Sequence, residues 1–185
     1  MPLENRGWEL LIQRQSRQTN ALTGAVRTVG TYQVYHGGAP IEPLTGTTAE
    51  SPGPSQNEWP ATSMDPRRIR SGRYPLATQA GTHYVTFGYD ETEDVFAWPK
   101  PGIELMFTGA RREILIHPGR NEFLSSIGCI NLCTRLPDAA EPISYPGSRR
   151  RVIALIEDMK GFLRDFPELN GKPVPDAAVV IEGDP

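Results

Sequence analysis

The sequence predicts a mainly β fold in a single domain, with one helix near the C-terminus. The 185 residues include 18 glycines and 18 prolines, which is typical of a chain with many turns between short elements. Short runs rich in β-branched and aromatic residues recur along the first two thirds of the chain. Only one stretch has apolar residues at helical spacing over several turns. No repeat and no linker interrupts the chain, so residues 1–185 are expected to form one domain with a sizeable core.

The expected strands follow from alternating or β-branched runs bounded by turn residues. They are residues 8–15, 25–35 (one or two strands), 82–88, 103–107 and 113–117, with a late edge strand over 176–182. Thr108 and Gly109 fit a hairpin between the fourth and fifth of these. Residues 41–64 are crowded with Pro, Gly, Ser and Thr and are predicted to be a loop, as is the acidic stretch 90–94. His36 is expected in a surface turn and His83 on a half-exposed strand.

The predicted helix covers residues 148–166. Its apolar residues fall on one stripe, which indicates core packing: Val152, Leu155, Ile156, Met159, Leu163 and Phe166. Ser148 follows Pro146 and Gly147 and is the expected N-cap, and Pro167 is expected to stop the helix.

Composition excludes several classes of protein. A net charge of −3 and 38% hydrophobic residues are typical neither of a disordered chain nor of a nucleic-acid binder. No apolar run is long enough to span a membrane. Cys129 and Cys133 are too close in sequence for a disulfide framework, and with His117 they give three zinc ligands where a structural site needs four. We therefore expect no metal and no cofactor.

The stretch 114–133 carries the chemistry. An apolar run ends at His117, a polar turn follows, and the stretch closes on Ser126-Ile127-Gly128-Cys129-Ile130-Asn131. A cysteine nucleophile needs a base, usually an imidazole, and a strand, turn and return segment brings Cys129 and His117 together. Gly128 allows a sharp turn that aims backbone amides at an oxyanion. A structural interpretation stands beside this one, because single histidines and apolar cysteines are usually packing residues.

This stretch resembles the active-site signature of the L,D-transpeptidase catalytic-domain (YkuD-type) family. That family carries a histidine at a strand end and later Ser/Thr-His-Gly-Cys, a hydrophobic residue, and Arg or Asn. Residues 126–131 fit at five of six positions; Ile127 stands where the family has its second histidine, and the gap from His117 to Cys129 is shorter. Weaker similarities precede it, at Tyr32–Gly38 with Leu44-Thr45-Gly46, and at Ser71-Gly72-Arg73-Tyr74.

The resemblance implies an L,D-transpeptidase-like β-sandwich or barrel and a set of roles. Cys129 attacks an acyl carbonyl, and His117 takes and returns the proton. The residue after the histidine orients the imidazole in the relatives, and here the carbonyl of Pro118 is available for that role. Ser126 and Asn131 fix the loop or bind substrate, and the amides of Gly128 and Cys129 are candidate oxyanion donors. The implied substrates are peptidoglycan stem peptides, for which Arg120 is a candidate ligand; Arg111, Arg112 and Arg135 also lie near, although such arginines are often only solvated surface.

The N-terminal residues lack the pattern of a Sec signal, so we expect synthesis in the cytoplasm. Three interpretations stay open. The protein is an effector delivered by a type VI-like secretion system, with an immunity protein or a secretion component as partner, and acts in a target periplasm. Alternatively, it is a cytosolic L,D-carboxypeptidase of muropeptide recycling, or a non-catalytic module that binds a peptide or a metal. Neither a nucleic acid nor a membrane span is expected.

Overall fold

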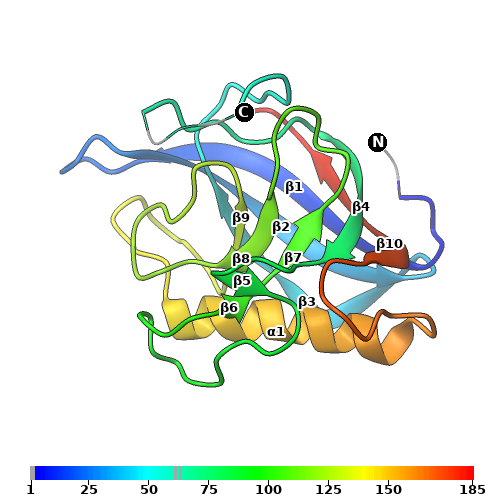
Figure 1. The fold of residues 1–185 in the computed structure, drawn as a ribbon. Coiled ribbons are helices and arrows are strands. Elements are labelled where there is room, and N and C mark those ends of the chain that lie inside the picture. Colours follow the sequence, from blue (N-terminus) through cyan, green and yellow to red (C-terminus); the bar gives the residue numbers. More distant parts are fainter. Residues whose placement is uncertain (1–2, 61, 63) are drawn as a thin grey trace.

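The computed structural model describes residues 3–60, 62 and 64–185, and these form a closed eight-stranded β-barrel with one helix against it (Figure 1). The mainly β prediction is confirmed. The barrel strands are β1 (Trp8–Thr19), β2 (Val26–His36), β3 (Ala39–Glu50), β4 (Gly72–Thr78), β7 (Ile103–Leu105), β8 (Leu115–Pro118), β9 (Ile130–Cys133) and β10 (Pro173–Glu182). A separate two-stranded sheet contains β5 (Tyr84–Val85) and β6 (Lys100–Pro101).

The strands follow one another around the barrel in the order β1, β10, β4, β7, β8, β9, β3, β2, and β2 pairs with β1 to close the ring. Two neighbouring pairs are parallel, β1 with β10 and β8 with β9, and the others are antiparallel. The second parallel pair matters for function, because it carries both His117 and Asn131 in register.

The core fills the barrel and continues onto the helix. Alternate residues of β1, namely Trp8, Leu10 and Ile12, are fully buried, as the period of a strand with one inward face requires. The same cluster includes side chains of every other barrel strand except β3 and also Val152, Leu155, Ile156 and Met159 of the helix. This main core thus joins the helix to the barrel.

Helix α1 (Tyr145–Phe162) begins earlier than predicted and lies along the bottom of the view in Figure 1. Ser144, not Ser148, is the N-cap, and its hydroxyl accepts a hydrogen bond from the amide of Gly147. Proline in the first turn is compatible with this start, because the first helical amides have no acceptor within the helix. Ser148 lies inside the helix, and its buried hydroxyl donates to the carbonyl of Leu132 and accepts from the amide of Gly119.

The end of the helix also differs from the prediction. α1 stops at Phe162, before Pro167, and Leu163 and Phe166 pack against the core from the segment that follows. Asp158 fixes the helix to the barrel by accepting hydrogen bonds from Trp8 Nε1 and His36 Nε2, both at 2.7 Å. His36, predicted to lie in a surface turn, is therefore a structural link at the end of β2, and its ring also stacks on Phe162.

Three strand predictions need correction. Residues 41–50, predicted to be loop, belong to β3, while residues 61 and 63 of the predicted loop lie outside the described residues. The expected strand 82–88 is reduced to β5, two residues long. The predicted edge strand at 176–182 is an inner member of the closed barrel, because β10 pairs with β1 on one side and β4 on the other.

In the part of the chain that the structure describes, no helix combines the length and the apolar character needed to cross a bilayer.

Candidate active site

The β8–β9 pair brings the predicted nucleophile and base to one face of the barrel wall. His117 pairs with Asn131 and Ile116 with Ile130, so Cys129 lies beside Leu115, one position before β9 begins. Ile116 and Ile130 point into the core. Because strand side chains alternate between faces, Cys129 and His117 both lie on the opposite, outer face. The parallel register thus places Cys129 and His117, which are twelve positions apart in sequence, on the same face of two neighbouring strands.

The thiol of Cys129 is held by backbone groups. Its Sγ accepts from the amide of Leu115 at 3.3 Å and lies 3.5 Å from the carbonyl of Glu113. Glu113 is a non-glycine residue with φ of 53°, an uncommon conformation that accompanies this placement of its carbonyl. Ser126 Oγ donates to the carbonyl of Cys129 at 2.7 Å, and Ser51 Oγ donates to the carbonyl of Ser126 at 3.0 Å. Ser126 therefore fixes the loop, one of its two predicted roles.

The imidazole of His117 is buried and has one defined backbone partner. Its Nδ1 lies 2.9 Å from the carbonyl of Pro118. A carbonyl only accepts, so this bond places the proton on Nδ1 and leaves the lone pair on Nε2. The ring of Tyr84 lies 4.3 Å from the imidazole ring, centroid to centroid. The backbone carbonyl of Pro118 thus occupies the orienting position that the sequence assigned to it.

Asn131 is not placed where a substrate ligand would be. Its side chain is fully buried, and its amide nitrogen donates to the carbonyl of His117 at 3.0 Å. The same nitrogen lies 3.4 Å from Nδ1 of His117, so Asn131 contacts both the backbone and the ring of the histidine. The prediction of a direct substrate contact is replaced by a positioning role.

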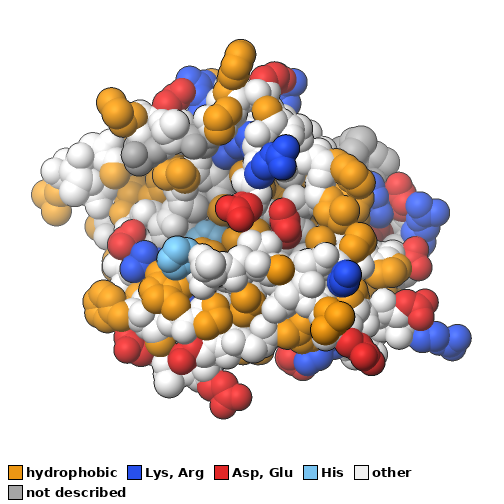
Figure 2. Space-filling view, in the orientation of Figure 1, with side chains coloured by type: hydrophobic (Ala, Val, Ile, Leu, Met, Phe, Trp, Pro, Cys, Tyr) orange, Lys and Arg blue, Asp and Glu red, His pale blue; other side chains and the backbone are white. Residues whose placement is uncertain are grey.

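Cys129 and His117 line the same cleft, which has a volume of about 480 Å³ and is called the histidine cleft below. Figure 2 shows histidine side chains in a hollow near the centre of this face, with acidic side chains beside it. The other residues that line the histidine cleft are Pro66, Tyr84, Glu122, Leu124, Ser125, Ser126 and Ile127. The pair is therefore open to a ligand from outside the barrel.

A second cleft of about 420 Å³, the tryptophan cleft, also reaches Cys129. Trp98 and Arg120 are among its lining residues, and the guanidinium of Arg120 lies 5.2 Å from the indole centroid. His83 is exposed on the same cleft, with its ring 4.8 Å from that of Trp98. Arg120 is thus placed where a cation can meet an acidic ligand near the thiol.

Both members of the pair are neutral in the resting protein. Burial, with a smaller contribution from Arg120, lowers the pKa of His117 to about 4 against the opposing effect of the Pro118 carbonyl. Burial raises the pKa of the Cys129 thiol to about 11. The base is available at neutral pH, but the thiolate forms only as the proton is transferred.

Gly128 lies at a bend of the backbone before β9, as predicted, and it also has a packing role. It is not among the described residues with a positive φ. Instead, a Cβ at this position would lie 1.7 Å from a terminal nitrogen of Arg111. Glycine is needed here because the guanidinium of Arg111 occupies the space of a side chain. Gly128 and Cys129 still share a pocket with Arg111, so their amides stay candidate oxyanion donors.

Cys133, the second cysteine of the chain, lies outside the candidate site. Cys133 is buried in a separate cluster with Val29, Ala49, Leu136 and Ile143, where burial raises the pKa of its thiol to about 12. Among the described residues, no three His, Cys, Asp or Glu side chains are grouped to hold a metal ion.

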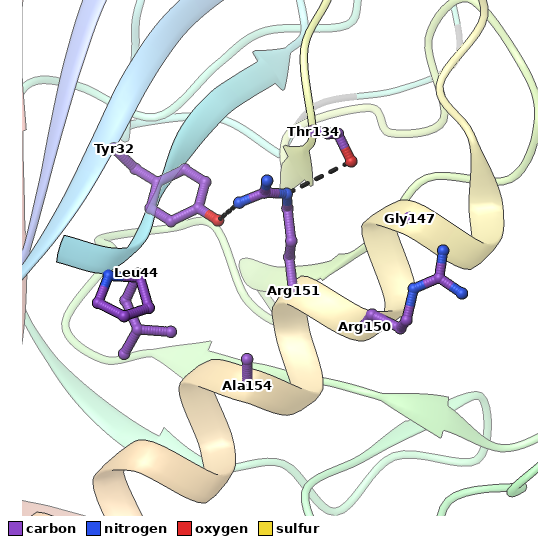
Figure 3. A pocket seen from close by; sticks show the side chains of 8 residues that line it. Tyr32, Leu44, Thr134, Gly147, Arg150, Arg151 and Ala154 are labelled. Carbon is purple, nitrogen blue, oxygen red and sulfur yellow. Dashed lines mark hydrogen bonds between the residues drawn. The ribbon is translucent and has the colours of Figure 1, made fainter. Parts of the chain in front are cut away.

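A pocket of about 240 Å³ beside α1 lies apart from Cys129 (Figure 3). In it Arg151 points toward the barrel and donates to Tyr32 Oη at 2.7 Å and to the carbonyl of Thr45 at 2.5 Å, so its charge is already occupied in joining the helix to β2 and β3.

No protein-family model, no curated protein and no solved structure matches this chain. The interpretation of the site therefore depends on its own geometry.

Sequence reasoning missed three residues at the site. Tyr84 and Trp98 lie on and beside the small β5–β6 sheet, whose placement over β8 has no local sequence signal. Arg111 was noted only as a nearby charge, because the sequence does not distinguish it from Arg112, the next residue before β8.

Proposed function

We propose that this protein is a cysteine acyltransferase or peptidase of peptidoglycan stem peptides, an L,D-transpeptidase or L,D-carboxypeptidase. One observation carries the proposal: Cys129 and His117 line one cleft, with Nδ1 of His117 held by the Pro118 carbonyl and Nε2 left as the acceptor. This is the arrangement of nucleophile, base and orienting group that acyl transfer needs.

The first step transfers one proton and forms one bond. As Sγ of Cys129 attacks the substrate carbonyl carbon, its proton passes to Nε2 of His117, and the negative charge moves to the carbonyl oxygen. When that intermediate collapses, the carbon–nitrogen bond breaks and the leaving amine takes the proton from Nε2. A thioester to Cys129 remains. A second amine or a water then attacks the thioester while Nε2 of His117 takes its proton. The carbon–sulfur bond breaks and Sγ of Cys129 recovers that proton, which completes transpeptidation or carboxypeptidation.

The charges around the clefts support an acidic, amine-bearing substrate. Arg120 and Glu113 both line the tryptophan cleft beside Cys129, so a ligand there meets one cation and one anion. Stem peptides carry both kinds of group. The rim differs from the family pattern at Ile127, which is 49% exposed on the histidine cleft. Because this departure sets the site apart from housekeeping relatives, we favour an antibacterial effector delivered by a type VI-like system.

The test is incubation of the purified protein with tetrapeptide muropeptides, followed by mass analysis. Shortened or cross-linked products are expected from the wild type and none from Cys129→Ala. Cys133→Ala is the matched control, because that thiol lies in a separate buried cluster, and it should keep full activity per folded molecule. Full activity in Cys129→Ala would overturn the proposal. Binding of the peptide without any product would leave a non-catalytic module.

A further inference from the structure

Arg111 is a buried arginine without a carboxylate partner. Its residue is 3% exposed, and no acidic side chain in the described residues forms an ion pair with it. Among the other buried arginines, Arg14 is paired with Glu50 and Arg68 with Asp184. Arg27 and Arg149 have no ion pair in the described residues, but they donate to backbone carbonyls at 3.0 Å or less. A buried charge usually needs such a partner, because desolvation is costly. The uncompensated charge of Arg111 therefore suggests a functional role for this side chain.

The hydrogen bonds that Arg111 makes within the protein are long and incomplete. Its two terminal nitrogens donate to the carbonyls of Gln56 at 3.3 Å and Ile127 at 3.4 Å. Its Nε is buried and has no partner. These contacts hold the group in place but do not neutralise it. The charge stays available to an anion in the adjoining pocket.

That adjoining pocket contains the thiol. It has a volume of about 210 Å³ and is lined by Arg111, Gly128 and Cys129 among others. The terminal nitrogen of Arg111 fills the space that a Cβ at Gly128 would take, so the guanidinium is pressed against the residue that precedes the nucleophile. Arg111 lowers the pKa of the Cys129 thiol, against the larger effect of burial and the smaller one of the Glu113 carboxylate, which both raise it.

We infer that Arg111 is the counter-ion for the negative charge that develops at Cys129 during acyl transfer. The inference rests on the proposed role of Cys129 as nucleophile. When the thiol proton passes to Nε2 of His117, the charge left on sulfur, and then on the carbonyl oxygen, faces the fixed guanidinium. Arg111 is a positioning residue that acts through Cys129. Its charge is pre-organised, because the barrel wall and not the substrate holds it.

The test measures the thiol directly and needs no peptide substrate. In a Cys133→Ala background, so that a single thiol reacts, the rate of alkylation by iodoacetamide is followed against pH. The rate follows the thiolate fraction. Arg111→Gln should raise the apparent pKa of Cys129 and slow alkylation about tenfold or more at pH about 8.5, where most of the thiol is protonated. Arg111→Lys should recover much of the rate, because it keeps the charge.

Two further variants provide a control and a second test of the inference. Arg135→Gln removes an exposed arginine elsewhere and should leave the profile unchanged. Gly128→Ala keeps the charge but displaces the guanidinium, so it should also slow alkylation, and it serves if Arg111→Gln does not fold. Thermal unfolding verifies that each protein is folded.

An unchanged profile in folded Arg111→Gln or Gly128→Ala would overturn the inference, as would Arg111→Lys reacting as slowly as Arg111→Gln. Failure of the muropeptide assay alone would reject the proposed substrate and leave this result standing.

Discussion

The side-chain amide of Asn131 donates a hydrogen bond to the carbonyl of His117 across the parallel β8–β9 pair, at 3.0 Å. The two residues are partners in register, and both are buried. The bond ties the strand of the base to the strand that begins just after the nucleophile. It therefore constrains the relative position of the two strands that carry Cys129 and His117, and the same nitrogen lies 3.4 Å from Nδ1 of the imidazole.

Asn131→Ala should accordingly lower kcat and leave KM nearly unchanged. Loss of the bond allows β8 and β9 to shift, and a displacement on the order of 1 Å between reacting groups costs up to about 100-fold in rate. The unpaired carbonyl of His117 should also reduce the free energy of unfolding by about 1–3 kcal/mol. Steady-state kinetics on muropeptides and denaturant unfolding measure the two effects.

Asn170→Ala is the matched control for that variant. Asn170 holds the backbone of Phe87 through its own side-chain amide, at 2.9 and 3.0 Å, and does not contact His117. It should lose stability but keep kcat per folded molecule. If both asparagine variants lose kcat equally, Asn131 has no special role in positioning the base.

The buried neutral His117 should make stability depend on pH. Its pKa is about 4 in the folded protein and about 6.5 in an unfolded chain, so protonation favours unfolding. Its contribution is fully present above pH about 6.5 and is lost as the pH falls toward 4, by up to about 3 kcal/mol. His117→Gln should remove this part of the pH dependence, measured by urea unfolding at several pH values. His83→Gln, at an exposed histidine, should behave like the wild type; a His117→Gln curve that keeps the wild-type slope would show that His117 titrates normally.

The helix should stabilise the barrel through its buried stripe. Leu155 is 1% exposed and belongs to the main core, so Leu155→Ala should reduce the free energy of unfolding by about 2–5 kcal/mol. Glu157→Ala, on the exposed side of the same helix, should change it by less than about 0.5 kcal/mol, because the ion pair of Glu157 with Lys160 is solvent-exposed. Equal effects of the two substitutions in chemical denaturation would contradict the packing described above.

If the protein is an effector, its toxicity should depend on compartment. Fusion of a Sec signal to the N-terminus should make expression lethal or misshape cells, because the active site then reaches the wall polymer. The same chain without the signal should be nearly harmless, and Cys129→Ala should silence the exported form. Growth, cell shape and wall composition are the measurements.

The remaining outcomes of that experiment separate the other interpretations. A recycling carboxypeptidase should instead shift the soluble muropeptides from tetrapeptides to tripeptides without killing the cells. Harmless export with an unchanged wall would eliminate the effector. An unchanged soluble pool as well would leave the non-catalytic module.

The sequence was informative where local pattern and structure agree. The β-branched runs of β1 and β2 and the helical stripe from Val152 to Met159 were correctly predicted, because each buries one face at its own period. β3 was not, because residues 41–50 were predicted to be a loop, and its mostly exposed, proline-bearing residues 39–45 carry no alternation of burial. The inner position of β10 was missed because its partners, β1 and β4, are distant in sequence and a short stretch of sequence does not indicate distant strand pairing.

At the site, sequence reasoning found Cys129, His117 and Pro118, which lie in one short stretch. It assigned Asn131 to the substrate because side-chain direction depends on the register of β8 against β9. It could not separate Arg111 from its exposed neighbour Arg112, since only burial distinguishes the two guanidinium groups. The sequence also could not predict the protonation states of His117 and Cys129, because these depend on how far burial removes each group from water.

Strand β10 closes the ring almost opposite β9, between β1 and β4. During synthesis on the ribosome, β1 and β4 must therefore wait as unpaired sheet edges until residues 173–182 have emerged. Cys129 and His117 are synthesised well before the barrel that aligns their side chains can close. The two side chains are therefore aligned only after residues 173–182 have been synthesised, and a synthetic peptide of residues 173–182 supplied to a chain lacking them is the natural probe of that delay.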